Sequence, residues 1–274
     1  MGSNKATIDY FDYETGVYTK NIYAERNPGV VKELGDVGND IQIYGDKLYA
    51  VINCSHFVEV MDVNTAKHIT QISIPNCRYL AFKDRYAYVS SYAGPVLIDP
   101  NARLGYVAKV DTVTLQVVDT CTVGYQPDEL VVVGNKLYVA NSGGYRVPNY
   151  DNTISVIDLE TFTEIKKIEV AINLHRLELD KYGYLYVSSR GDYYYTPSKT
   201  FIIDTKTDQV IKTLNLLPNT EMTLCGDSLY IYITEWSYLT NSNPISYAIY
   251  DVAKRKTVTR NFITDGTEKE IAIP

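Results

Sequence analysis

Short apolar segments separated by turn residues recur along the whole chain. These segments are rich in Tyr, Val, Ile and Leu, which is typical of β-strands on half-buried sheets. No segment sustains the 3.6-residue periodicity of an amphipathic helix. The pattern therefore predicts an all-β protein.

One motif consists of a strand that ends in Asp, a tight turn that contains Thr, and a second strand. The Asp carboxylate of such a turn can accept backbone N–H bonds two residues on. Successive copies are 50, 49, 47, 46 and 47 residues apart, and the last has Lys254 where Thr is expected; they begin at Asp12, Asp62, Asp111, Asp158, Asp204 and Asp251.

A second motif alternates with the first and consists of a polar turn followed by an apolar strand that contains Tyr. Its turn chemistry is that of two-residue hairpins, and its copies occupy residues 45–49, 84–89, 134–139, 182–187 and 226–230. Each repeat of roughly 47 residues thus contains four antiparallel strands, as propeller blades do. The chain is predicted to be a β-propeller of four-stranded blades.

The repeats divide one domain, residues 1–274, into five complete blades and two partial ones. The partial blades are 1–30, which begins with a strand over 6–11, and 263–274; the complete ones are 31–75, 76–124, 125–171, 172–216 and 217–262. A closed propeller completes one blade from both ends of the chain, and part of that closure is missing here. We expect a piece of a longer propeller, seven-bladed by preference and six-bladed as the alternative.

The loops between the second and third strands of each blade are long and vary from blade to blade, which is where function usually lies. They carry aromatic and Arg side chains, the composition of an interaction hot spot. Taken singly, each aromatic side chain can instead cover a strand end. The predicted ligand-binding residues are Asn53, His56, Arg78, Tyr92, Asn141, Tyr145, Arg146, Arg190, Tyr193, Tyr194, Trp236 and Tyr238.

Charged residues also stand at the entrances of the inner strands, on the same face as these loops. They are Arg78, Asp128, His175, Arg176 and Glu221. Two arrangements are compatible with them. They pair with one another and fill the centre, or they converge as the polar floor of a ligand site.

Composition and motifs argue against several classes of function. A net charge of −7 argues against nucleic-acid binding, which needs clustered Lys and Arg. No apolar run approaches the roughly 18 residues of a membrane-spanning helix. The sequence contains three His and none of the common nucleophile, zinc or phosphate-loop motifs, and no ligand set for a metal is assembled. We therefore expect no catalytic activity, no cofactor and no metal, with a metal-dependent hydrolase or lyase as the weakest alternative.

Four cysteines lack the spacing of a metal site. Cys54 and Cys77 are expected on one face of adjacent blades. Two free thiols are favoured there, and a disulfide is the alternative. A disulfide would indicate an extracytoplasmic protein.

The texts Lys-Leu-Tyr-Val-Ala-Asn at 136–141 and Ile-Asp-Leu-Glu-Thr at 157–161 resemble the YncE-like and surface-layer-type propellers. Residues 4–10 and 34–38 add similarity to the surface-exposed propeller lipoproteins of gut Bacteroidetes. The resemblance implies a lipid-anchored protein at the outer-membrane surface. One branch of that family captures vitamin B12 (cobalamin) and delivers it to an outer-membrane transporter, which makes a corrinoid the leading ligand.

Two functions therefore stand beside each other. In the first, the Tyr- and Trp-lined face captures cobalamin. In the second, the same face docks a protein or a glycan and holds no small molecule. A deep aromatic bowl would favour the first, and a flat or filled face the second.

Overall fold

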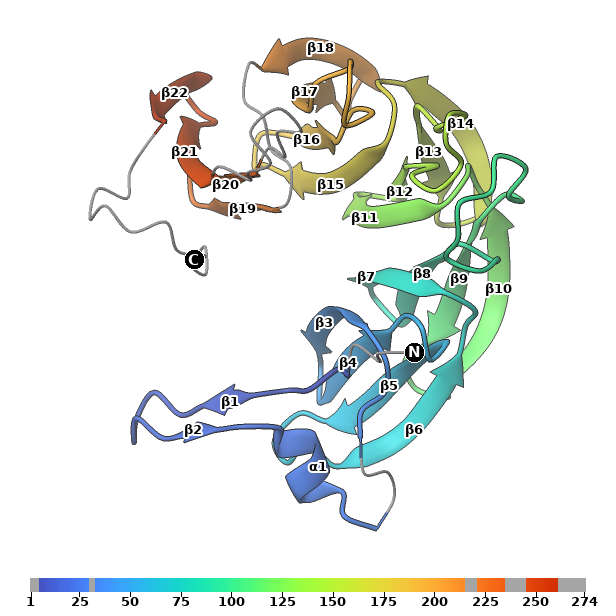
Figure 1. Cartoon of the computed structure of the whole chain (residues 1–274), viewed down its shortest axis with the longest axis vertical. Coiled ribbons are helices and arrows are strands. Elements are labelled where there is room, and N and C mark those ends of the chain that lie inside the picture. The colour runs from blue at the N-terminus through green and yellow to red at the C-terminus, as the bar shows by residue number, and fades with distance from the viewer. Residues whose placement is uncertain (1–4, 30–32, 215–220, 235–244, 261–274) are drawn as a thin grey trace. The chain divides into compact units, whose positions relative to one another are not determined.

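The computed structural model describes residues 5–29, 33–214, 221–234 and 245–260 (Figure 1). Within them the chain forms five four-stranded antiparallel sheets and one two-stranded sheet. The chain divides into two compact units: unit 1 comprises Met1–Leu97 with Ala102–Val123, and unit 2 comprises Ile98–Asn101 with Gly124–Pro274.

Unit 1 contains a hairpin, a short helix and two four-stranded sheets. The hairpin and helix are β1 (Tyr10–Phe11), β2 (Tyr18–Thr19) and α1 (Ile22–Arg26). The first four-stranded sheet comprises β3 (Gly38–Tyr44), β4 (Lys47–Ile52), β5 (Phe57–Asp62) and β6 (His68–Ser73). The second comprises β7 (Cys77–Lys83), β8 (Tyr86–Ser91), β9 (Tyr106–Asp111) and β10 (Gln116–Thr122).

Unit 2 contains three four-stranded sheets. The first comprises β11 (Pro127–Val133), β12 (Lys136–Asn141), β13 (Thr153–Asp158) and β14 (Thr163–Glu169). The second comprises β15 (Leu174–Leu179), β16 (Tyr184–Ser189), β17 (Lys199–Asp204) and β18 (Gln209–Leu214). The third comprises β19 (Glu221–Cys225), β20 (Ser228–Thr234), β21 (Ile245–Asp251) and β22 (Lys256–Thr259).

In all five four-stranded sheets the strands lie in the order of the sequence, each antiparallel to the next. This is the predicted blade. The Tyr of the second strand serves the core in several blades: Tyr49, Tyr138 and Tyr186 are at most 1% exposed. Part of the unusual Tyr content is therefore explained by packing within and between blades.

The repeated Asp turns are confirmed at atomic detail. The Asp62 carboxylate accepts the backbone N–H groups of Asn64 and Thr65, at 3.1 and 2.9 Å. Asp158 makes the same pair of bonds to its own turn. The carboxylate replaces the partners that the turn's backbone would otherwise seek in water.

The amino-terminal strand predicted over 6–11 is shorter than expected. Only Tyr10–Phe11 is a strand, and the hairpin leads into helix α1. The helix spans five residues, too few to show a helical period in the sequence. Asn27 at its end is buried and binds two parts of the first sheet's turn, donating to the Ala66 carbonyl and accepting from the His68 N–H.

The inner strands carry the irregularity that positions the polar residues. The pairing of β7 with β8 slips between Cys77 and Leu80, and that of β15 with β16 slips between Leu174 and Leu177. A β-bulge of this kind turns a backbone N–H away from its ladder. A carboxylate of the preceding blade then accepts it: Glu129 binds the Leu177 N–H at 2.6 Å. Among the described residues, no helix is long and apolar enough to cross a membrane.

Candidate functional site

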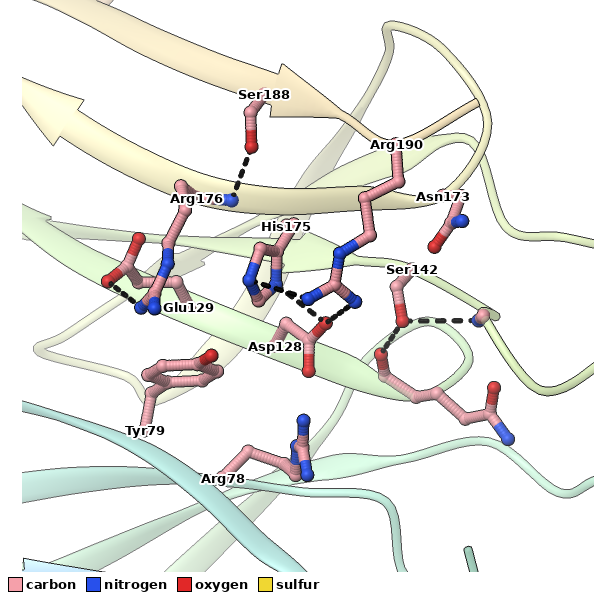
Figure 2. A network of polar contacts seen from close by, with 12 residues as sticks. Arg78, Tyr79, Asp128, Glu129, Ser142, Asn173, His175, Arg176, Ser188 and Arg190 are labelled. Atoms are coloured by element: carbon pink, nitrogen blue, oxygen red, sulfur yellow. Dashed lines mark hydrogen bonds and ion pairs between the residues drawn. The ribbon is translucent and has the colours of Figure 1, made fainter. Parts of the chain in front are cut away.

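Three side chains from two blades meet at the inner-strand entrances of unit 2 (Figure 2). Asp128 stands on β11, His175 on β15, and Arg190 directly follows β16. The His175 Nδ1 lies 3.1 Å from an Asp128 oxygen, and its Nε2 lies 2.7 Å from an Arg190 nitrogen. Asp128 and His175 are 0% and 3% exposed, so the contact is shielded from water.

This geometry fixes the protonation of His175. A guanidinium can only donate, so the Nε2 must accept and carries no proton. The Nδ1–H then donates to Asp128. Burial, with the Arg190 charge as the second cause, lowers the pKa of His175 to about 3. The imidazole is therefore a neutral bridge between a carboxylate and a guanidinium, and a proton donor or acceptor for a substrate is not available at either nitrogen.

A second cluster lies beside the first and joins three blades. Arg176 on β15 binds Glu129 of β11 at 3.2 Å and also contacts Glu221 of β19. The backbone N–H of Arg176 is bonded in turn to Ser188 of the adjacent strand at 2.9 Å. One guanidinium thus ties the inner strands of all three sheets of unit 2.

Glu178 is the carboxyl group of this cluster that is held protonated. Burial raises its pKa to about 8, and the negative charge of Glu129 adds to the effect. The Arg176 charge acts in the opposite direction but is shared with Glu129 and Glu221. The protonated form of Glu178 is therefore favoured over the pH range in which an ordinary Glu is ionised.

Of the two arrangements predicted for the charged entrance residues, mutual pairing is confirmed for those in unit 2. Asp128 is bonded to His175 in the first cluster, and Arg176 to Glu221 in the second. Their polar atoms stabilise the packing of neighbouring blades.

The loop that follows β16 is braced at its base by two small polar side chains. Ser189 donates to the Ile172 carbonyl at 2.7 Å, and Asn173 donates to the Gly191 carbonyl at 2.9 Å. Gly191 has φ +64°, and a Cβ there would lie 1.9 Å from the Thr196 carbonyl oxygen. Only glycine fits this position. The loop is thus held in one conformation from below.

The tip of the same loop displays three consecutive tyrosines. One Asp192 oxygen accepts the N–H groups of Tyr194, Tyr195 and Thr196 at 2.8 to 2.9 Å, which fixes the turn. Tyr193, Tyr194 and Tyr195 are 44%, 71% and 94% exposed. We call residues 190–198 the tyrosine loop. Its rings are presented outward by a backbone that is already ordered.

The corresponding loop of the preceding blade, residues 141–152, has a different character. Asn141 is fully buried and bonds to the Gly124 N–H and to the Thr153 and Ser155 hydroxyls, so it supports the loop from inside. Tyr145 is 38% exposed at the surface. Arg146 lies 3.5 Å over the ring of Tyr125, and this contact orders its guanidinium.

Four predicted residues belong to unit 1. Asn53 is buried and donates to the Cys77 carbonyl at 3.0 Å, while His56 accepts the Asn76 N–H on its Nδ1 at 3.1 Å. Arg78 lies 4.7 Å over the ring of the buried Tyr92. All four make structural contacts at the loops where the sequence placed them. The other two predicted residues, Trp236 and Tyr238, lie outside the described residues.

All four cysteines are free, as favoured for Cys54 and Cys77. Cys77 is buried against the Phe57 carbonyl. Burial raises the pKa of its thiol to about 12. It is an inert structural thiol in the folded chain.

Sequence reasoning missed Glu129, Glu178 and Asn173. The roles of Glu129 and Glu178 are not visible in the sequence, because strands far apart in sequence bring these carboxyl groups close to the Arg176 guanidinium. Asn173 has φ +56°, a conformation that Asn tolerates and that no run of residue types reveals. A comparison of the repeats offers one signal: Asn76 occupies the same place before β7 and donates to the Gly94 carbonyl in the same way.

In the part of the chain that the structure describes, no three or more His, Cys, Asp or Glu side chains are arranged to hold a metal ion. The carboxylates of Glu129 and Glu221 are paired with the Arg176 guanidinium.

Comparison with solved structures shows the fold. The matches include Kuenenia stuttgartiensis hydrazine synthase, with a TM-score of 0.67, 16% identity, and 80% of this chain and 64% of that chain covered. A chain of the mitotic checkpoint complex matches with a TM-score of 0.66 and 9% identity over 96% of this chain and 74% of that one. BamB from Moraxella catarrhalis matches with a TM-score of 0.52 and 17% identity over 80% and 59%.

The chain spans less than two thirds of the hydrazine synthase and BamB chains. At these identities the likeness shows the fold alone, a β-propeller. No curated protein sequence matches the chain. A family model matches residues 1–194, which is more than half of the sequence. The chain therefore belongs to the family described as domain of unknown function DUF5074.

Proposed function

We propose that this chain is a non-enzymatic binding propeller that docks a protein partner through the tyrosine loop. The observation that carries the proposal is the exposure of Tyr193, Tyr194 and Tyr195 on a loop that Asp192 and Asn173 hold in place. Tyr offers a large ring and a hydroxyl at a low entropic cost, because it has only two rotatable side-chain bonds.

The rigidity of the loop favours affinity. Association normally loses free energy in ordering side chains and loops at the interface, and a loop ordered in advance avoids most of that cost. The three N–H bonds to Asp192 order the tip, and the Gly191 backbone and Ser189 hydroxyl order the base. Exposed aromatic anchors of this kind dominate the energetics of protein interfaces.

The polar network below the loop supports docking over catalysis. His175 is a neutral bridge with both nitrogens bonded, and Arg190 is engaged by His175 and Asp128. These contacts commit His175 and Arg190 to each other and to Asp128, which favours a structural role for this part of the network. A matched structure from the mitotic checkpoint complex is also part of a protein assembly.

The sequence resemblance adds a specific ligand, cobalamin, and a location at the outer-membrane surface beside a transporter. The same tyrosines would stack on the corrin ring, and amide groups would bond to its side chains. The ion pairs that fill the inner-strand entrances of unit 2 weigh against a deep bowl in that unit. Protein docking is therefore the primary form of the proposal, and cobalamin capture is its tested alternative.

The test is site-specific photocrosslinking in the source cells. Tyr195→p-benzoylphenylalanine places the probe on the tyrosine loop, and Tyr13→p-benzoylphenylalanine is a matched control in unit 1, since the two positions are 94% and 91% exposed. Protein docking predicts one dominant adduct from position 195 that position 13 does not give, and that Tyr194→Ser abolishes.

A cyanocobalamin titration and a glycan array separate protein docking from ligand capture and from glycan recognition. Cyanocobalamin binding that Tyr194→Ser weakens would move the function to ligand capture. Glycan-array binding without a protein adduct would move it to glycan recognition. Identical adduct patterns from positions 195 and 13 would refute docking through the tyrosine loop.

A further inference from the structure

Unit 1 contains a cavity of about 670 Å³ that is remote in sequence from the tyrosine loop. It is bounded by the amino-terminal segment, helix α1, strands β3 and β4, and the turn after β5. Its volume is within the range of small-molecule sites, roughly 300 to 1,000 Å³. The predicted binding residues take no part in it.

The apolar wall of the cavity comes from an unusual strand. On β3, Gln42 and Tyr44 face the next blade, where Gln42 donates to the Leu80 carbonyl and the Tyr44 ring stacks on Phe82. Ile41 and Ile43 therefore point the other way, since successive side chains alternate. They remain 50% and 64% exposed on the cavity wall.

The amino-terminal segment and helix α1 add apolar lining. Ile8 and Ile22 line the cavity from these segments, and Leu48 lines it from β4. Tyr23 is fully buried beside them and donates to the buried Glu59 at 3.1 Å, which anchors the helix to the sheet. Helix α1 is thus fixed to the sheet, and the cavity beside it is lined by branched aliphatic side chains.

Two cations line the same cavity, Arg26 at the end of α1 and Lys67 in the turn after β5. The buried Asn27 holds these two segments together through its bonds to the Ala66 carbonyl and the His68 N–H, so the cations come from segments bonded to each other. Arg26 has an exposed partner in Glu25, and Lys67 makes no ion pair with the described residues. Like charges held on one wall favour an anion.

One acidic group also lines the cavity. Asp9 accepts bonds from the Tyr18 hydroxyl and the Asn21 N–H. The Tyr18 bond is the largest cause of a lowered pKa at Asp9, so this carboxylate is charged and satisfied by its own hairpin. Among the residues that line the cavity, Arg26 and Lys67 are basic and Asp9 alone is acidic, while Glu25 pairs with Arg26 from outside the lining.

We infer that this cavity binds an amphipathic anion with a single alkyl chain, its carboxylate at Arg26 and Lys67 and its chain against Ile41 and Ile43. The chemistry is that of a medium-chain carboxylate that is free in solution. This site is independent of the tyrosine loop, so its failure would leave the docking proposal intact.

The test is isothermal titration of the full chain with sodium decanoate below its micelle concentration. Loss of two methylenes, in octanoate, should weaken binding about tenfold. Neutral decanol should bind at least fivefold more weakly than decanoate. Lys67→Gln should weaken decanoate to the level of decanol, and Ile43→Asp should abolish binding.

Matched controls lie in unit 2, where Lys206→Gln is exposed in an equivalent Asp turn and Ile165→Asp is on an exposed strand. Both should bind decanoate as the parent chain does. Equal binding of decanol and decanoate, or no binding, would overturn the inference. So would a dimer in sedimentation that Ile43→Asp dissolves without any decanoate heat, since the face would then bind a second copy. Binding only to phosphatidylglycerol vesicles would likewise exclude capture of a free amphiphile.

Discussion

Glu178→Gln should stabilise the protein, and the gain should grow as the pH rises. The folded chain holds the Glu178 pKa at about 8 because the carboxyl is buried beside Glu129, whereas its ordinary value is 4.5. Between these two values the unfolded chain releases a proton that the folded chain keeps. The stability that the protonated Glu178 contributes is therefore fully present below pH 4.5. It is lost progressively as the pH rises from 4.5 to 8.

The magnitude follows from that shift. Each pH unit in this window is worth at most about 1.4 kcal/mol, so the ceiling at pH 7 is about 3 kcal/mol. The positive charge of Arg176 lowers the pKa of Glu178 and so reduces this effect. We therefore expect Glu178→Gln to raise the free energy of unfolding by about 1–3 kcal/mol. For a domain of this size that is an increase in Tm of roughly 3–10 °C.

Thermal unfolding followed by circular dichroism at pH 5, 6, 7 and 8 measures the effect. The parent and Glu178→Gln proteins should coincide near pH 5 and diverge above it. Glu160→Gln, at an exposed turn of the same unit, is the control and should show no divergence. A Glu178→Gln protein that is less stable than the parent at pH 8 would refute a neutral, buried Glu178.

Three further outcomes are expected. Arg190→Met should lower the free energy of unfolding, measured in urea, by about 2–4 kcal/mol, because it leaves the buried Asp128–His175 contact without its cation. The exposed control Lys199→Met should lower it by less than 0.5 kcal/mol. Equal losses would contradict the network. Gly191→Ala should lower Tm by more than Gly226→Ala, since both have positive φ but only the first Cβ meets backbone; equal losses would show that strain alone matters. Cys77 should resist Ellman's reagent at pH 8 until urea unfolds the chain, because burial raises its thiol pKa to about 12; fast labelling of the native protein would contradict its burial.

The sequence predicts best what is local. The Asp turns follow from a carboxylate and the N–H groups two and three residues on, so each is specified within four residues. The sequence also indicates locally that Tyr193, Tyr194 and Tyr195 cannot all point inward, but not which of them are exposed. The structure adds the reason for their rigidity, the three bonds to Asp192.

What the sequence does not predict depends on register and on neighbours from other repeats. The role of Glu129 arises from a bulge in β15 that frees the Leu177 N–H. The raised pKa of Glu178 arises first from burial and second from the charge of Glu129 on the adjacent blade. Helix α1 is too short to leave a periodic signal. The cavity under it exists because β3 turns its polar residues toward the next blade and its isoleucines away.

The affinity of the tyrosine loop for its partner tests the central claim most directly. With the partner identified by crosslinking and purified, the parent chain, Tyr194→Ser/Tyr195→Ser and the control Tyr13→Ser are compared by titration. Docking through the tyrosine loop predicts at least a 30-fold loss for the double variant, the about 2 kcal/mol or more of a hot spot, and no change for Tyr13→Ser. Equal affinity of all three proteins would contradict it.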